Sequence, residues 1–475
     1  MVFSSMVFLW VFLPAVLIIY YFIDKKYKNL VLLISSLIFY SFGEPKYILL
    51  MVLSIIINYI FGILVDREEN LLKRKLILAL SVFINLAILG YFKYFNFFTE
   101  SLNKLFNSEI IALKEIILPI GISFYTFQAL SYVVDVYRGK GVEGGTKVQK
   151  NIFDLALYIS FFPQLIAGPI VKYYDIEAQL RNRDESLTRI TYGIKRFIFG
   201  LSKKVLISNV MASTADSIFK LPIDGVGTPL AWLGLITYTL QIYYDFSGYS
   251  DMAIGLGEIF GFTFMENFNY PYISKSIKEF WRRWHISLST WFKEYLYIPL
   301  GGNRKGKYRT YVNLFIVFLA TGLWHGASFN FILWGMIHGF FIVIERMFLG
   351  KILDKNKFKL LNHIYTLFVV MIAWVFFRVD GFREALRYIK ALFVYRQGSL
   401  INNIDLYLNK EVILIVIIGI LFSGIIQMLF KGLTKKIYLR DGIKVYEVFI
   451  LIILLFLCIV SIVSGTYNPF IYFRF

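Results

Sequence analysis

The chain has 475 residues, of which 58% are hydrophobic and 19% are aromatic. A soluble core cannot bury so large an apolar share, so the composition excludes an ordinary soluble protein and predicts an integral membrane protein. The formal net charge is +19, but the basic residues lie in short loops between apolar runs, which is typical of a bacterial inner-membrane protein and argues against nucleic-acid binding.

Apolar runs suited to membrane helices recur along the whole chain, since about 20 apolar residues cross a bilayer as a helix. We expect spans over residues 6–23, 29–42, 46–65, 75–98, 110–135, 151–170, 190–214, 229–262, 309–324, 328–348, 362–378, 411–430 and 446–465. Some are short or interrupted, as by Pro163, Gly168 and Pro169, which is typical of re-entrant elements that line a cavity. The sequence therefore predicts an all-α, polytopic membrane protein with roughly 10–13 transmembrane and re-entrant helices.

The loops indicate an orientation in the cell membrane. Basic clusters follow the first, third and fifth predicted spans and precede the last one: Lys25, Lys26 and Lys28; Arg67, Lys73, Arg74 and Lys75; Arg138, Lys140, Lys147 and Lys150; Lys431, Lys435, Lys436, Arg440 and Lys444. The positive-inside rule places these loops in the cytoplasm, so we expect both termini outside. The first 22 residues lack the basic region and cleavage site of a signal peptide, which predicts a retained helix. No repeat or large polar block divides residues 1–475, so we expect a single membrane domain.

The region 275–310 is strongly basic and is expected at the cytoplasmic face. On a helix, four apolar side chains of this region would share one side: Trp281, Trp284, Leu288 and Trp291. This spacing predicts an interfacial amphipathic helix with a tryptophan belt. Arg282 and Arg283 either anchor that helix to anionic headgroups or bind a phosphate-bearing ligand, such as the nucleotide part of an acyl thioester.

Two of the four histidines are candidate site residues: His285 lies within this basic region, and His325 lies between two apolar runs. A buried neutral imidazole can take a proton from a hydroxyl at neutral pH. His325, beside Trp324, is the candidate general base, and His285 is a candidate for polarising the thioester or orienting the substrate. A hydrogen-bonded structural role is the alternative for each of them. We expect structural roles for His338 and His363.

Two aspartates, Asp245 and Asp251, lie in a run that we expect to be embedded in the membrane. An isolated charge there costs roughly 2.5–3.5 kcal/mol. Each carboxylate must therefore be paired, hydrated or protonated. They either line a funnel or belong to a structural hydrogen-bond network, and we favour the network.

Three further stretches match a pattern known from one family: Met1–Ser5 (MVFSS), Tyr243–Ala253 (YYDFSGYSDMA) and Tyr297–Gly302 (YIPLGG). With the two histidine segments, they make nearly the whole chain resemble the membrane-bound O-acyltransferase family and its alginate O-acetyltransferase-like subgroup. The resemblance implies a ring of tilted helices around a thin centre. A cytoplasmic tunnel and an extracytoplasmic funnel would meet there at the histidine that His325 represents. It also implies acetyl-CoA as the acyl donor, a substrate that Arg282, Arg283 and Trp324 would bind.

The chain ends in an aromatic tail, residues 469–475, in which Arg474 is the one charged side chain. In the resembled family, a tyrosine in a C-terminal aromatic motif is proposed to accept the acyl group, and Tyr472 stands at that position. Our hypothesis is that Tyr472 carries the acyl group as an ester on the outer side. The alternative is that the tail anchors at the outer membrane interface.

Together these features favour an acyltransferase that moves an acetyl group from a cytoplasmic thioester across the membrane for O-acetylation of an extracellular polysaccharide. The resemblance implies an extracytoplasmic esterase-type partner protein, and the chain itself has no Gly-x-Ser-x-Gly elbow. We expect no permanently bound cofactor and no metal; the one cysteine, Cys458, lies in an apolar run. The alternatives are D-alanyl transfer to teichoic acid from a carrier protein and, in another class, a proton-coupled transporter or flippase, although paired halves are not visible.

Overall fold

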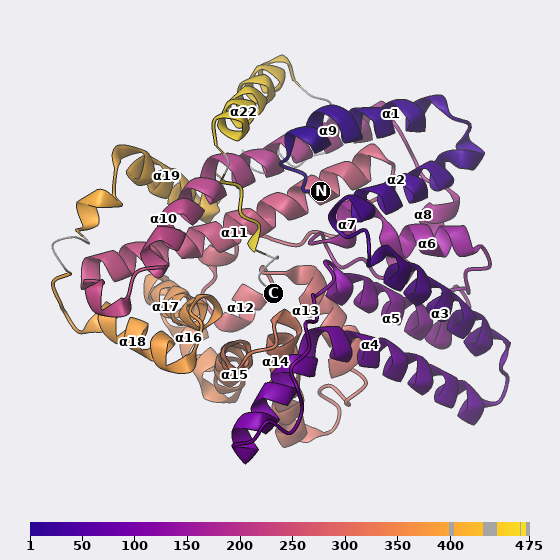
Figure 1. The fold of residues 1–475 in the computed structure, drawn as a ribbon, viewed down its shortest axis with the longest axis horizontal. Helices are drawn as coiled ribbons and strands as arrows, with labels where there is room; N and C mark the ends of the chain where they lie inside the picture. Colours follow the sequence, from indigo (N-terminus) through magenta and orange to yellow (C-terminus); the bar gives the residue numbers. More distant parts are fainter. Residues whose placement is uncertain (399–402, 431–443, 466, 472–475) are drawn as a thin grey trace. The chain divides into compact units, whose positions relative to one another are not determined.

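The computed structural model describes residues 1–398, 403–430, 444–465 and 467–471. Every regular element in these ranges is helical, which confirms the predicted all-α class (Figure 1). Residue contacts divide the chain into two compact units, one of Met1–Ile194 and Ala253–Met265 and the other of Lys195–Met252 and Glu266–Phe475. The expectation of a single membrane domain stays a prediction.

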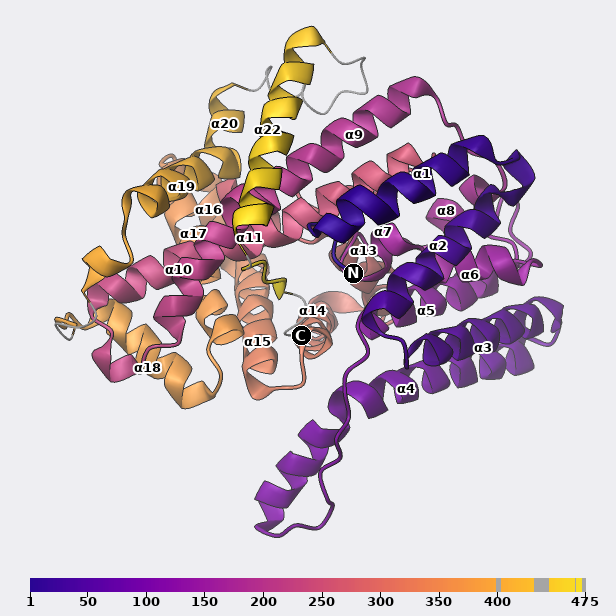
Figure 2. The ribbon, with the colours of Figure 1, turned by 45° about the horizontal axis from the view of Figure 1, so that its top comes forward.

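The first unit contains long helices and several short ones. They are α1 (Leu13–Phe22), α2 (Lys28–Gly43), α3 (Ile48–Arg67), α4 (Leu71–Phe106), α5 (Ile122–Gly139), α6 (Ile152–Ser160), α7 (Phe162–Leu165) and α8 (Tyr173–Arg181). In Figures 1 and 2, α3 and α4 run side by side, and α5 packs against both. The helices α9 (Leu187–Ser202) and α11 (Thr228–Ile259) contribute residues to both units.

Two asparagines join α3 to α4 within an otherwise apolar contact. Asn58 Nδ2 donates to Asn85 Oδ1 at 3.0 Å, and Asn85 Nδ2 donates to Asn58 Oδ1 at 2.9 Å. Both side chains are buried. The two amides satisfy each other where water is scarce, so the pair fixes the register of the two helices.

The predicted span 110–135 is wrong in its first part, which is not helical. The reason lies in two asparagine side chains of α4. Asn96 donates to the carbonyl of Lys114 and accepts from its N–H, and Asn103 does the same with Ile111. Because each amide replaces a backbone partner, the chain returns along α4 in an extended form.

The second unit contains the remaining helices. After the π-helical turn Lys203–Ser208 come α10 (Asn209–Phe219), α12 (Ile277–Trp281), α13 (Ile286–Phe292), α14 (Gly306–His325), α15 (Phe329–Ile344), α16 (Gly350–Lys355), α17 (Lys359–Arg378), α18 (Phe382–Phe393), α19 (Lys410–Ile420), α20 (Ile426–Leu429) and α22 (Val445–Ser464). Its core is rich in large aromatic side chains. Trp334 and Trp374 are its largest fully buried members.

Two glycines bring α14 and α15 into close contact. A Cβ on Gly322 would lie 2.4 Å from the carbonyl oxygen of Phe331, and one on Gly335 would lie 2.3 Å from that of Phe318. Only residues without a side chain permit this approach of the two backbones. The contact therefore fixes the C-terminal end of α14, which is His325.

Six helices among the described residues are long and apolar enough to cross a membrane. They are α3, α4, Phe329–Lys355, α17, Lys410–Leu429 and α22. The other predicted spans are shorter or more polar. One of them, 151–170, breaks between α6 and α7, as its prolines predicted. The count of roughly 10–13 spans and re-entrant helices stays a prediction.

The asparagine pair between α3 and α4 can be tested by a double-mutant cycle. Asn85→Leu strands the buried amide of Asn58, so we expect stability to fall by about 1–2 kcal/mol. Asn58→Leu together with Asn85→Leu should recover most of that loss, because no polar group is left unsatisfied. Thermal unfolding of the purified protein in detergent measures both, and a double variant less stable than the single one would contradict the pairing.

Candidate active site

The basic region 275–310 begins with two short helices, α12 and α13, and the single amphipathic helix that we predicted is wrong. His285 separates α12 from α13 with φ 42°, a left-handed conformation. Trp281, Trp284 and Trp291 are each no more than 7% exposed. They therefore pack inside the protein and do not form the predicted belt at the membrane surface.

The side chain of Asn267 holds the turn at His285. Its Oδ1 lies 3.1 Å from His285 Nδ1 and accepts from the N–H and hydroxyl of Ser287 at 3.2 and 2.9 Å. Its backbone carbonyl accepts from the N–H of Ile286 at 3.0 Å. A left-handed conformation is unfavourable for a residue with a Cβ, so it persists because these bonds impose it.

The same contact determines the tautomer of His285. Asn267 Nδ2 donates to Ser250 Oγ at 3.0 Å, which turns the amide oxygen toward the ring. His285 Nδ1 therefore carries the proton, and Nε2 carries the lone pair. The ring is fully buried, and burial lowers the pKa of His285 well below its usual range. The imidazole is consequently neutral and presents a basic nitrogen.

His325 is the last residue of α14 and is 5% exposed. Aromatic rings surround its imidazole: those of Trp334 and Phe377 lie 4.9 and 5.2 Å away, between ring centroids. Trp324 contacts both candidate histidines, at 5.0 Å from His325 and 5.9 Å from His285. The structure therefore brings the two predicted histidines to the same tryptophan.

A third histidine belongs to the same aromatic cluster. Trp281 Nε1 donates to His338 Nδ1 at 3.2 Å, and the His338 ring lies 4.9 Å from that of Trp334. This hydrogen bond agrees with the structural role that we expected for His338. That His338 and His325 contact the same Trp334 could not be predicted, because only the close packing of α14 and α15 brings the two histidines together.

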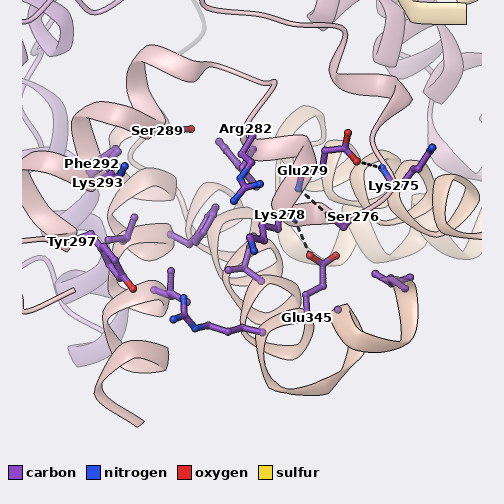
Figure 3. Close-up of a pocket in the computed structure, with 18 of the residues that line it drawn as sticks. Lys275, Ser276, Lys278, Glu279, Arg282, Ser289, Phe292, Lys293, Tyr297 and Glu345 are labelled. Carbon is purple, nitrogen blue, oxygen red and sulfur yellow. Dashed lines mark hydrogen bonds between the residues drawn. The ribbon is translucent and has the colours of Figure 1, made fainter. Parts of the chain in front are cut away.

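A cavity of about 1070 Å³ is lined by residues of α12, α13 and α14 and by residues of α15, α16 and α17; Figure 3 draws many of them as sticks. Basic side chains predominate among its charged lining: Lys275, Lys278, Arg282, Lys293, Arg346, Lys351 and Lys359, with Glu279, Glu345 and Asp354 as the acids. Its apolar wall includes Trp281 and Phe318 and continues to Thr321. Neither His285 nor His325 lines the cavity, but Thr321 lies one helical turn before His325, and Trp281, in the same wall, donates to His338.

The two predicted arginines differ in their surroundings. Arg282 is exposed and lines the cavity, where Figure 3 shows its side chain among the labelled residues. Arg283 does not line it: its guanidinium pairs with Glu279 at 2.9 Å and donates to the carbonyl of Asn269 at 3.0 Å. Trp324 does not line the cavity either. Of the three predicted donor-binding residues, the cavity contains Arg282.

Glu345 is a site residue that the sequence reasoning missed. Its carboxylate accepts from the backbone N–H groups of Ile277 and Lys278 at 2.6 and 2.9 Å, the second of which is drawn in Figure 3. The Tyr365 hydroxyl donates to it at 3.2 Å. Glu345 thus caps the first turn of α12 and fixes one wall of the cavity. The sequence alone does not reveal this contact, because Lys278 and Glu345 are 67 positions apart.

Both aspartates, which we predicted to be paired, hydrated or protonated, are paired. Asp251 contacts Arg196 and Lys203, each at 2.6 Å, and Asp245 contacts Lys204 at 2.5 Å. Tyr472 lies outside the described residues. Within those residues, no group of three or more His, Cys, Asp or Glu side chains is arranged to hold a metal ion.

The sequence of the chain matches known proteins. Residues 110–380 match the profile of MBOAT, the membrane-bound O-acyltransferase family. The chain is 42% identical to a protein of Pseudomonas putida named probable alginate O-acetylase AlgI, over the full length of both chains. It is 37% identical to the peptidoglycan O-acetyltransferase of Helicobacter pylori, over 82% of this chain and 80% of the relative.

A more distant relative represents the alternative substrate class. The teichoic acid D-alanyltransferase of Bacillus subtilis is 30% identical, over 54% of this chain and 66% of the relative. The similarity to the alginate O-acetylase therefore covers much more of the chain.

The role of Asn267 can be tested by removing its side chain. Asn267→Ala deletes the acceptor that holds His285 and the start of α13, so we expect stability to fall by about 1–3 kcal/mol. Asn269→Ala is the matched control, because Asn269 is exposed and its described bonds involve the backbone. Thermal unfolding compares the two variants. Equal stability would contradict the assignment.

Proposed function

The chain belongs to the membrane-bound O-acyltransferase family and is a multi-pass membrane acyltransferase; we propose that it moves an acetyl group from a cytoplasmic thioester, acetyl-CoA, across the membrane for O-acetylation of an extracellular or cell-envelope polysaccharide. The observation that carries the proposal is the cavity whose basic rim leads to Thr321, one turn from His325. The family does not favour a transporter or flippase.

The charge of the cavity suits the proposed donor. Acetyl-CoA carries phosphates at one end and the thioester at the other. Arg282, Lys278 and Lys351 would attract the phosphates at the rim, and the apolar wall at Phe318 would receive the arm that carries the thioester. This arrangement matches a rim at the cytoplasmic face, which is where the positive-inside rule places such a basic region.

His325 is the proposed general base. The lone pair of its imidazole would take the proton of the acceptor hydroxyl as that oxygen attacks the thioester carbonyl carbon. The C–S bond then breaks, the thiolate of CoA leaves and takes up the proton, and the acetyl group becomes an ester. His285, neutral and with a lone pair at Nε2, would accept a hydrogen bond from the substrate and so orient it.

The acceptor on this chain is proposed to be Tyr472. Its hydroxyl would receive the acetyl group as an aryl ester, and a nucleophile of an extracytoplasmic partner protein would take the acetyl group from it and regenerate the phenol. The partner would then acetylate the polysaccharide. Both termini are proposed to lie outside, on the side of that partner.

The relatives favour O-acetylation over D-alanyl transfer. The alginate O-acetylase relative matches the whole chain, whereas the D-alanyltransferase relative matches about half of it. We propose only the class of the acceptor polymer, a polysaccharide, because the names of the relatives include both alginate and peptidoglycan.

Replacing the proposed base should abolish transfer. His325→Ala is expected to lower the rate of acetyl transfer by a factor of about 10²–10⁴. His363→Ala is the matched control, since His363 is half-buried with its Nδ1 3.2 Å from the carbonyl of Ser274 and lies apart from the cluster. Transfer of radiolabel from acetyl-CoA to extracellular polymer measures both at equal expression. Undiminished labelling by His325→Ala would contradict the role, and labelling from carrier-bound D-alanine alone would contradict the donor.

The two neighbouring arginines test the donor site. Arg282→Gln removes a cationic side chain from the cavity, so we expect the KM for acetyl-CoA to rise about fivefold, the effect of roughly 1 kcal/mol, with little change in kcat. Arg283→Gln, outside the cavity, should leave KM unchanged. Initial rates at varied acetyl-CoA concentrations measure this, and the difference should shrink at high salt. Equal KM values for the two variants would exclude Arg282 from donor binding.

A further inference from the structure

Two ion pairs join the region after α9 to α11, and the first is fully buried. Lys204 and Asp245 are 3% and 1% exposed and lie 2.5 Å apart. Lys203 pairs with Asp251 at 2.6 Å. The two lysines are adjacent in the sequence, and they lie in the π-helical turn Lys203–Ser208, whose wider backbone lets both reach carboxylates of one helix.

The first of these pairs contacts the C-terminal segment, which we define as Tyr467–Ile471. The carboxylate of Asp245 accepts from the N–H of Ile471 at 2.8 Å, and Lys204 Nζ donates to the carbonyl of Pro469. Phe470, between them, packs on Tyr249 with ring centroids 4.8 Å apart. Lys204 and Asp245 thus bind the backbone on both sides of Phe470.

A second ion pair holds the start of the segment. The hydroxyl of Tyr467 donates to Asp216, which pairs with Arg378 at 2.7 Å. Asn209 Nδ2 donates to the side-chain oxygen of Asn468 at 3.3 Å. At the other end, Phe470 and Ile471 are 7% and 4% exposed. Chain ends usually fray, whereas this segment is bonded at both ends and buried at its last two residues.

The docked segment is close to the candidate active site through α11. On this helix, Asp245 and Tyr249 contact the segment. The next residue in each case faces the site: the Phe246 ring lies 4.6 Å from that of His285, and Ser250 accepts from Asn267. Residues at i and i+4 share a helix face, so two neighbouring faces of the same turns contact the segment and the histidine site.

We propose that Lys204 and Asp245 are positioning residues that hold the C-terminal segment beside the histidine site, and that this docking is required for acyl transfer. The inference rests on the proposed function, in which Tyr472, the residue after Ile471, accepts the acetyl group. Neither side chain takes part in bond making. Their proposed effect is to restrict the C-terminal segment to one place. The acceptor hydroxyl would then have a smaller volume to sample before it meets the thioester.

The experiment measures docking and transfer separately. The background carries Cys458→Ala and Ile471→Cys, which leaves one thiol at a buried position of the segment. Into it we introduce Lys204→Met with Asp245→Leu, which removes both contacts without leaving an unpaired buried charge. The matched control is Lys203→Met with Asp251→Leu, the neighbouring pair on the same elements, where Arg196 keeps its partner Glu266.

The first readout is the rate of labelling by a membrane-impermeant maleimide, and the second is acetyl transfer from radiolabelled acetyl-CoA to polymer. For Lys204→Met with Asp245→Leu, we expect labelling at least about tenfold faster and transfer at least about tenfold slower than in the background, a factor that corresponds to about 1.4 kcal/mol. The control pair should match the background in both. Lys204→Arg, which keeps the charge, should remain protected and active.

Two results would overturn the inference. One is labelling at the background rate, which would mean that the pair does not hold the segment. The other is fast labelling with full transfer, which would mean that docking is not required. Asp245→Asn is measured in parallel, so a failure of the double variant to fold does not remove the test. Tyr472→Phe separates this inference from the proposed function: it should stay protected but lose transfer, and a variant that is protected and fully active would reject the relay and not the docking.

Discussion

Hydrogen bonds and ion pairs between residues far apart in the sequence hold several buried polar groups of the described residues, and the positions of His285, α12 and Lys204 depend on them. An uncompensated charge or amide in an apolar interior costs several kcal/mol, so each one demands a specific geometry from its neighbours. Asn267 hydrogen-bonds the turn at His285, and Glu345 accepts from the N–H groups of the first turn of α12. Asp245 pairs with the buried ammonium of Lys204. These interactions orient the surrounding helices as a consequence.

Aromatic packing then brings the oriented groups together. The glycines Gly322 and Gly335 let α14 approach α15 until Trp334 can contact both His325 and His338. Trp324 links His325 to His285. A cluster of large rings excludes water and also restricts the rotation of an imidazole packed among them. Both effects suit a base that must remain neutral and fixed.

Much of this was visible in the sequence, and the exceptions share one physical cause. Apolar runs predicted the all-α membrane class, and the cost of an isolated charge predicted that Asp245 and Asp251 are paired, hydrated or protonated, of which pairing is found. The periodicity of the tryptophans wrongly predicted one helix through His285, because periodicity reports local amphipathicity and not a hydrogen bond from a residue 18 positions away. Glu345 and the docking of Tyr467–Ile471 were missed for the same reason: their partners lie far away in the sequence.

The docked segment also bears on how a membrane enzyme can serve two compartments. A site open to both faces at once would provide a path for water and ions through the bilayer. An acyl carrier that belongs to the chain itself, as proposed, would avoid such a path, since the acetyl group would move while the buried side chains of Phe470 and Ile471 remain packed. In that mechanism the ion pair of Lys204 and Asp245 has two consequences. It would hold Tyr467–Ile471 against the protein, and it would limit the distance over which the acyl group is carried. A covalent relay therefore requires that the protein hold the acyl-carrying segment in a fixed place. A freely moving segment would neither exclude water nor position the acyl group.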